Sequence, residues 1–228
     1  MRQTQNTHRI SDECFFFEME NKISYQADGR YFANGSNSAK KLLLCLHGYG
    51  HLGEYFLSQF DHLHADEYFI VVPEAPHRFY LNGTGGKVGA SWMTKENREA
   101  DITNYIRMLN SVMSDVLMRR SFEKKILLGF SQGGATASRF FTLGDTLFDA
   151  LILWGTVFPA DMELTAHERL SKSKNYFVVG NQDKYYKSGE ITIDREKFSE
   201  SGTKFGLITF DGAHELHNHT LNQLLHEI

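Results

Sequence analysis

The stretch EKKILLGFSQGGATASRFF, from Glu123 to Phe141, decides how this chain folds. Its first half is a short apolar run, which is typical of a strand buried on both faces. Glycines then surround a single serine, Ser131, and the residues after it have helical spacing. The stretch therefore predicts a strand, a sharp turn and a helix, with Ser131 in the turn.

Short apolar runs of the same kind recur along the chain. They are LLLCL (42–46), YFIVVP (68–73), ALILWG (150–155), YFVVG (176–180) and FGLITF (205–210). Segments with helical spacing lie between several of them, within residues 53–63, 96–120, 133–145 and 192–201, and a last one closes the chain at 217–228. This alternation predicts an α/β fold with a mostly parallel central sheet flanked by helices.

The first forty residues have a different pattern. The short runs CFFFEME, KISYQA and RYFAN are separated by turn residues, among them Asp28-Gly29. Asp-Gly between strand-like runs is a hairpin signal. We therefore expect residues 1–40 to form a β hairpin region at the antiparallel edge of the same sheet. Because the chain has 228 residues and only three prolines, we expect one domain over residues 1–228.

The glycine-rich segment NGTGGKVG, residues 82–89, is the most flexible-looking part of the sequence. It lacks the spacing of a phosphate-binding loop. We interpret it as a mobile surface loop that borders a site.

Composition narrows the classes of partner. The formal charge is -4, so the chain lacks a strong basic field. Its charge therefore does not suggest nucleic acid or an anionic membrane as a partner. Two cysteines make no disulfide framework, and the polar first residues do not look like a secretion signal. No apolar run approaches the roughly 18 residues of a membrane span. We expect a cytoplasmic protein without stable membrane insertion.

Ser131 lies where a parallel sheet binds its ligands, at the carboxyl end of a strand. The spacing G-x-S-x-G suits a turn so sharp that side chains on its neighbours would clash. An ordinary structural turn is the alternative. A catalytic serine needs a base, and His214 directly follows the last strand-like run, on the same sheet edge.

The base in turn needs an acid, and two aspartates follow strand ends. Asp183 comes after YFVVGNQ, and Asp161 comes after ALILWGTVF. We favour Asp183, because the order serine, aspartate, histidine is the one expected for an α/β-hydrolase. Asp161 stays open as the alternative.

An oxyanion formed at Ser131 needs backbone donors already in place. We predict that the N–H of Gln132, just after the serine, is one donor. The loop HGYG after the run LLLCL offers the other, for which Tyr49 N–H is the candidate. His47 at the start of this loop is expected to organise it by hydrogen bonding.

The segments LHGYG, PEAP, GFSQGG, GNQD and GAHE occur in this order. In this the sequence resembles the carboxylesterase/phospholipase family that includes the acyl-protein thioesterases, from about Leu42 to the C-terminus. The resemblance implies an α/β-hydrolase fold and a serine esterase without a cofactor. It also implies the nucleophile, acid and base at Ser131, Asp183 and His214, and oxyanion donors at Tyr49 and Gln132. The continuation DKYY after Asp183 departs from the family pattern.

We therefore predict a serine-dependent carboxylic ester hydrolase acting on a small-molecule or lipid-like acyl ester. Tyr49 and Trp92 are candidates to line the acyl pocket, with a place in the core as the alternative for Trp92. An acyl-thioester hydrolase is the alternative function, and a non-catalytic ligand-binding protein is the rival of another class. The histidines of HELHNH lack zinc-site spacing, so no metal is expected. An exposed apolar patch could support a homodimer, but the sequence does not locate one.

Overall fold

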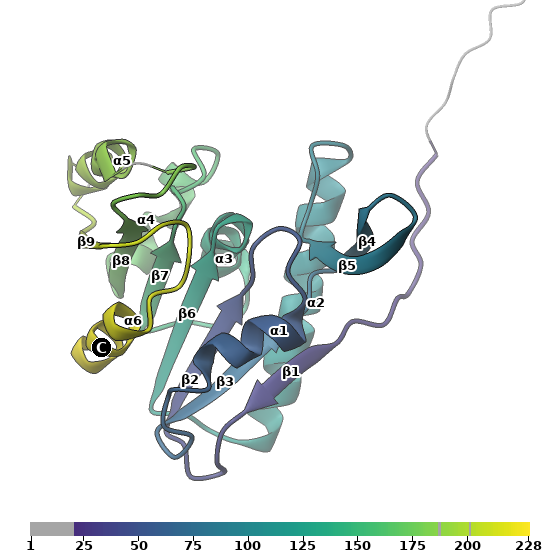
Figure 1. The fold of residues 1–228 in the computed structure, drawn as a ribbon, viewed down its shortest axis with the longest axis horizontal. Helices are drawn as coiled ribbons and strands as arrows, with labels where there is room; N and C mark the ends of the chain where they lie inside the picture. The colour runs from purple at the N-terminus through teal and green to yellow at the C-terminus, as the bar shows by residue number, and fades with distance from the viewer. Residues whose placement is uncertain (1–20, 187, 201) are drawn as a thin grey trace, which may run out of the picture.

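A seven-stranded sheet forms the centre of the computed structural model, which describes residues 21–186, 188–200 and 202–228 (Figure 1). Its strand order is β1-β3-β2-β6-β7-β8-β9. The strands are β1 (Tyr31–Asn34), β2 (Lys41–Leu46), β3 (Tyr68–Pro73), β6 (Lys124–Phe130), β7 (Ala150–Trp154), β8 (Lys174–Gly180) and β9 (Phe205–Phe210). Neighbouring strands run parallel, except that β1 is antiparallel to β3. The prediction of a mostly parallel α/β sheet with an antiparallel edge is confirmed.

Helices cover both faces of the sheet (Figure 1). They are α1 (Gly53–Leu57), η1 (Ser58–Phe60), α2 (Arg98–Arg119), α3 (Gln132–Leu143), α4 (Glu163–Leu170), α5 (Ser188–Glu200) and α6 (Asn218–Glu227). Leu44 of β2 packs in the same cluster as Tyr105 of α2. Its neighbour Leu43 packs in the other cluster, with Phe56 of α1. Because successive residues of a strand face opposite layers, both must be apolar, which explains the continuous apolar runs.

The N-terminal hairpin prediction is only partly right. The segment RYFAN supplies β1, which pairs with β3 in register Phe32 to Val72. Residues 21–30, however, contain no strand and are exposed, so the expected strand at KISYQA and its turn at Asp28-Gly29 are wrong. The run CFFFEME lies outside the described residues. An isolated two-stranded hairpin is marginal in water, and β1 is stabilised by the sheet instead.

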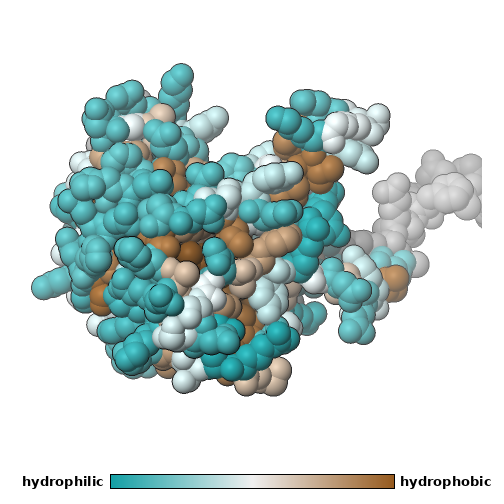
Figure 2. Space-filling view, turned by 60° about the horizontal axis from the view of Figure 1, so that its bottom comes forward, coloured by the Kyte–Doolittle hydropathy of each residue, from teal (hydrophilic) through white to brown (hydrophobic). Residues whose placement is uncertain are grey.

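Two further elements differ from the sequence-based expectations. The glycine-rich segment 82–89 is not simply a loop, because most of it belongs to the antiparallel hairpin of β4 (His77–Asn82) and β5 (Gly85–Ser91). Gly83 has a φ of 67°, a conformation that suits a tight hairpin turn. Helix α4 was not expected at all. Figure 2 shows one face of the molecule, which is mostly hydrophilic, with hydrophobic side chains gathered in its middle.

Candidate active site

Ser131 has an unusual backbone conformation. It is the N-cap of α3, with φ 54° and ψ -121°. Within the described part of the chain, Asn97 is the only other residue besides glycines with a positive φ. Such a conformation costs free energy and persists only where the surroundings impose it. The turn between β6 and α3 therefore holds the serine in a strained, specific orientation.

The glycines around Ser131 are required by close approach of the backbone. A Cβ on Gly129 would lie 2.4 Å from the carbonyl oxygen of Gly133. A Cβ on Gly133 would lie 2.1 Å from the carbonyl oxygen of Leu46 at the end of β2. Both distances are far inside van der Waals contact. The motif thus allows α3 to begin directly against two neighbouring strands, with Ser131 at the junction.

His214 and Asp183 form a hydrogen-bonded pair at the carboxyl ends of the strands. Nδ1 of His214 lies 2.7 Å from Oδ2 of Asp183. The other carboxylate oxygen accepts hydrogen bonds from the backbone N–H groups of Tyr185, at 2.8 Å, and Tyr186, at 3.0 Å. The carboxylate is therefore fixed in place and orients the imidazole through Nδ1, and none of the hydrogen bonds among the described residues uses Nε2 of this ring.

These contacts keep Asp183 ionised. Its side chain is almost fully buried, with 1% of its surface exposed. Burial alone raises the pKa of Asp183, but hydrogen bonds from His214 and from two backbone N–H groups outweigh burial. The pKa of this carboxyl group therefore lies below its ordinary value. The oxygen that contacts Nδ1 of His214 therefore belongs to a negatively charged group.

The contacts of neighbouring residues place the turn of Ser131 close to His214. The ring of Phe130, directly before the serine, lies 4.9 Å from the His214 ring. The N–H of Ser131 donates to the carbonyl oxygen of Trp154 at 2.9 Å. The next residue, Gly155, has a φ of 57°, and a Cβ on it would lie 2.9 Å from Cε1 of His214. Among the described residues no hydrogen bond joins Ser131 to His214, although such bonds often tighten only when substrate binds.

Asp161, the alternative acid, lies in a different set of contacts. Its carboxylate makes ion pairs with Arg98, at 2.6 Å, and with Arg139, at 2.9 Å. Arg98 is the first residue of α2, and Arg139 lies in α3. The contacts of Asp161 are thus with these guanidinium groups, whereas those of Asp183 are with His214.

The HGYG loop lies against the serine turn. A Cβ on Gly48 would lie 3.3 Å from Cβ of Ser131. Among the hydrogen bonds of the described residues, none has the backbone N–H of Tyr49 or of Gln132 as its donor, so both are available for a ligand. The side chain of Gln132 is already engaged, since its amide nitrogen donates to the carbonyl oxygen of Met93 at 2.9 Å.

His47, the first residue of this loop, fixes it by hydrogen bonding. It is fully buried, its Nε2 accepts the N–H of Ala75 at 3.0 Å, and its Nδ1 contacts the carbonyl oxygen of Gly48 at 2.8 Å. Burial lowers its pKa to about 4, so the ring is neutral. This agrees with the expectation that His47 organises the loop.

Trp92 is placed in the core rather than on the surface of the site. Its side chain is 0% exposed, and its ring nitrogen donates to the carbonyl oxygen of His47 at 2.8 Å. In this conformation the ring has no surface with which to line an acyl pocket. Tyr49 is the opposite case, because it is 59% exposed and packs on Phe79 of β4. Of the two candidates, only Tyr49 is available to a ligand.

Sequence reasoning missed two groups that shape the site. One is Gly155, which has a positive φ and whose lack of a Cβ leaves room for the imidazole of His214. Its only signal in the sequence is a glycine after an apolar run. The other group is the backbone of Tyr185 and Tyr186, whose N–H groups bind Asp183. Backbone donors carry no signal of their own in a sequence.

The histidines of HELHNH do not gather around one point. His214 faces Asp183, whereas His217 contacts the hydroxyl of Thr220 at 2.8 Å and stacks on Phe210. In the part of the chain that the structure describes, no three His, Cys, Asp or Glu side chains are grouped so that they could hold a metal ion.

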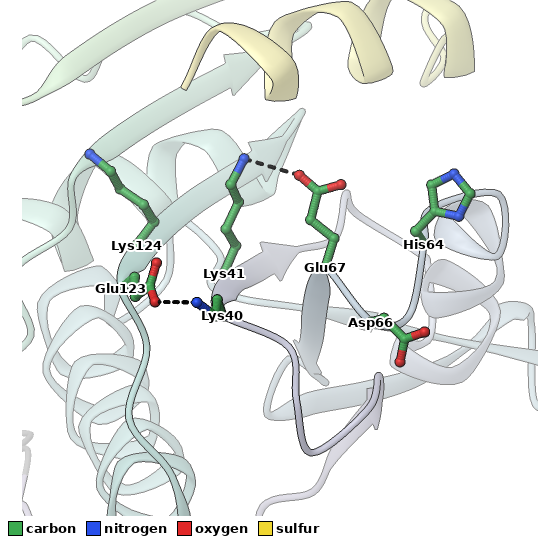
Figure 3. A pocket seen from close by; sticks show the side chains of 7 residues that line it. All are labelled: Lys40, Lys41, His64, Asp66, Glu67, Glu123 and Lys124. Carbon is green, nitrogen blue, oxygen red and sulfur yellow. Dashed lines mark ion pairs between the residues drawn. The ribbon is translucent and has the colours of Figure 1, made fainter.

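A separate hollow of about 420 Å³ lies at the opposite, amino-terminal edge of the parallel strands (Figure 3). Charged side chains line it, and ion pairs join Lys40 to Glu123 at 2.8 Å and Lys41 to Glu67 at 3.1 Å. Since His214, Asp183 and Ser131 all follow carboxyl ends of strands, this hollow is not part of their site.

The mostly parallel sheet, with a strained serine between β6 and α3 and a His–Asp pair after β8 and β9, defines the class of α/β-hydrolase folds. The model of the phospholipase/carboxylesterase family matches residues 29–228. The chain therefore belongs to this family. No curated protein matches it.

Solved structures similar to this chain show the same fold. Esterase PE8 is 24% identical with a TM-score of 0.65, over 88% of this chain and 98% of that one. Acyl-protein thioesterase 2 of Zea mays is 16% identical with a TM-score of 0.69, over 88% and 97%. A carboxylesterase of Bacillus cereus is 15% identical with a TM-score of 0.62, over 88% and 93%. At these identities the likeness concerns the fold alone.

None of the helices in the described ranges combines the length and apolar character needed to cross a membrane.

Proposed function

We propose that this protein is a serine-dependent carboxylic ester hydrolase that works through an acyl-enzyme. One observation carries the proposal. A serine in a strained turn at a helix N-terminus directly follows Phe130, whose ring contacts a histidine that is hydrogen-bonded to a buried, ionised aspartate. This combination of strain, base and acid has a catalytic use, and a purely structural turn needs none of it.

In the proposed reaction, Ser131 Oγ attacks the ester carbonyl carbon while His214 Nε2 takes its proton. Asp183 holds Nδ1–H of the imidazole and stabilises the resulting imidazolium. The imidazolium then gives the proton to the leaving alcohol as the acyl–oxygen bond breaks. Water, activated in the same way, hydrolyses the acyl-enzyme and restores the serine.

The N–H groups of Tyr49 and Gln132 are the proposed donors to the oxyanion. The free N–H of each and the contact between Gly48 and Ser131 support this assignment. Gln132 N–H also benefits from the N-terminus of α3, where backbone dipoles favour negative charge. The buried ring of Trp92 supports the loop through His47, so its proposed role is positioning.

An apolar acyl group suits the surface next to Tyr49. This ring is exposed and packs on Phe79, at a centroid distance of 5.1 Å. Leu81 and Val88 of the β4–β5 hairpin are also exposed, and the hairpin bonds to the loop through Gly50 N–H and the Ala90 carbonyl oxygen at 2.8 Å. The same machinery would cleave acyl thioesters, which remain the alternative substrate.

Two measurements with one variant test the proposal. Ser131→Ala should lower kcat on p-nitrophenyl esters by up to about 10⁶-fold, as loss of the nucleophile does in serine hydrolases. A fluorophosphonate probe should label the wild type and not this variant. Ser111→Ala, at an exposed position of α2, is the matched control and should change neither result. Full activity in Ser131→Ala would rule out the serine mechanism, and an unlabelled wild type would favour a non-catalytic ligand-binding protein.

Acyl thioesters measured beside oxygen esters of the same acyl chain would decide between the two substrate classes. A higher kcat/KM for the oxygen esters is the expected result.

A further inference from the structure

The position of the leaving group follows from His214. Nδ1 of its ring is bonded to Asp183, which leaves Nε2 as the nitrogen that exchanges the proton. In the proposed function, on which this inference rests, the leaving oxygen takes its proton from Nε2. The alcohol part of the substrate must therefore lie beside the His214 ring, within hydrogen-bonding reach of that nitrogen.

Three aromatic side chains surround this ring. Phe130 lies 4.9 Å from it, Tyr185 also lies 4.9 Å from it in an edge-on arrangement, and Tyr186 lies 6.1 Å from it. Phe130 is 4% exposed and Tyr186 is partly buried, but Tyr185 is 74% exposed. Tyr185 therefore combines contact with His214 and a ring surface free to touch a ligand.

Tyr185 is held in this place by the same loop that presents the acid. Its backbone N–H donates to Oδ1 of Asp183 at 2.8 Å, in the turn directly after β8. The backbone of Tyr185 is thus fixed two residues from Asp183, and its ring contacts the base. A large aromatic side chain that is exposed in water gains free energy when another ring packs against it, edge-on or offset-stacked.

We propose that Tyr185 forms the wall of a leaving-group subsite that takes aromatic alcohols. The substrates it favours are esters whose alcohol carries an aromatic ring separated from the ester oxygen by one methylene group. The acyl surface proposed above is that of Tyr49, so the two ends of the substrate would meet different aromatic residues.

A pair of esters of matched shape isolates the ring. Benzyl acetate and cyclohexylmethyl acetate share the acyl group and differ in the aromaticity of the alcohol. The wild type should have the higher kcat/KM for the benzyl ester. Tyr185→Leu should lower the ratio of the two kcat/KM values by about 2- to 13-fold, the range that corresponds to one aromatic pair. Tyr185→Phe should keep the ratio, because the ring and not the hydroxyl makes the contact.

Tyr55→Leu is the matched control, since Tyr55 is 70% exposed on α1 and is not among the described rings that contact His214. It should leave the ratio unchanged. An unchanged ratio in Tyr185→Leu would overturn the subsite. An equal fall for both esters would also overturn it, because Tyr185 would then only position the base.

Failure of the proposed function would give a different set of results from failure of the subsite alone. Ser131→Ala that still hydrolyses both esters would refute the serine mechanism and, with it, the subsite that rests on it. A wild type that hydrolyses neither ester would refute both as well. If the wild type hydrolyses both esters and Ser131→Ala hydrolyses neither, the ratio in the Tyr185 variants decides the subsite alone.

Discussion

Lowering the pH should destabilise the fold through His47. This side chain is fully buried at the end of β2, and both ring nitrogens have partners. Since the N–H of Ala75 donates to Nε2, the proton of the neutral ring is on Nδ1, facing the carbonyl oxygen of Gly48. A second proton on Nε2 would break the bond to Ala75 and place a charge in the core.

The magnitude follows from the pKa. Burial lowers the pKa of His47 from 6.5 to about 4. Between these values the unfolded chain takes up a proton and the folded chain does not, so stability is lost as the pH falls through this window. At about pH 5 the loss should reach about 2 kcal/mol, and below about pH 4 it should level off at about 3 kcal/mol.

The measurement is urea unfolding at about pH 7.5 and about pH 5, for the wild type and for His47→Gln. Glutamine has a donor and an acceptor but does not titrate. The variant should be less stable at the higher pH, yet the fall in its free energy of unfolding between the two pH values should be about 2 kcal/mol smaller than that of the wild type.

His64→Gln, at an exposed position, is the matched control and should behave as the wild type does. Equal pH dependence in His47→Gln and the wild type would refute the reasoning.

Three further outcomes are expected. Asp183→Asn should lower kcat for ester hydrolysis by up to about 10⁴-fold, because it favours the wrong tautomer of the imidazole. Asp161→Asn should leave kcat within a few-fold of the wild-type value. The reverse result would make Asp161 the acid. Gly155→Ala should lower kcat and remove about 1–3 kcal/mol of stability, because a Cβ there is strained and displaces His214; wild-type kinetics would contradict this. The Cys45 thiol, fully buried and with its pKa raised by burial, should react with a thiol reagent only as the protein unfolds, which rate measurements with the other cysteine replaced by serine would check.

The order of the elements was predictable because it depends on local patterns. A strand covered on both faces must be apolar at every position, so runs such as that of β6 are visible without the structure. The turn at Ser131 is visible as a local glycine spacing, although the contact that requires Gly133 is with Leu46 of β2, a residue distant in the sequence. Strand ends at one edge of a parallel sheet then bring Ser131 and the segment around His214 together.

Elements that are mostly outside the core were less predictable. The segment KISYQA, residues 22–27, has the composition of a strand but forms none, and the hairpin of β4 and β5 was hidden by its glycines. In both cases the outcome depends on pairing between distant residues, or on turn geometry, more than on residue preference.

The sequence by itself determined the fold class, the serine turn and the place of the histidine, because apolar periodicity and glycine spacing are visible within short stretches of the chain. Only the tertiary structure decided which aspartate meets His214. Asp183 and Asp161 both follow strand ends, but β8 is the neighbour of β9, so the loop of Asp183 lies against the loop of His214. Asp161 is held by two arginines of α2 and α3. The same holds for the burial of Trp92, because contacts between distant segments depend on the packing of the whole chain.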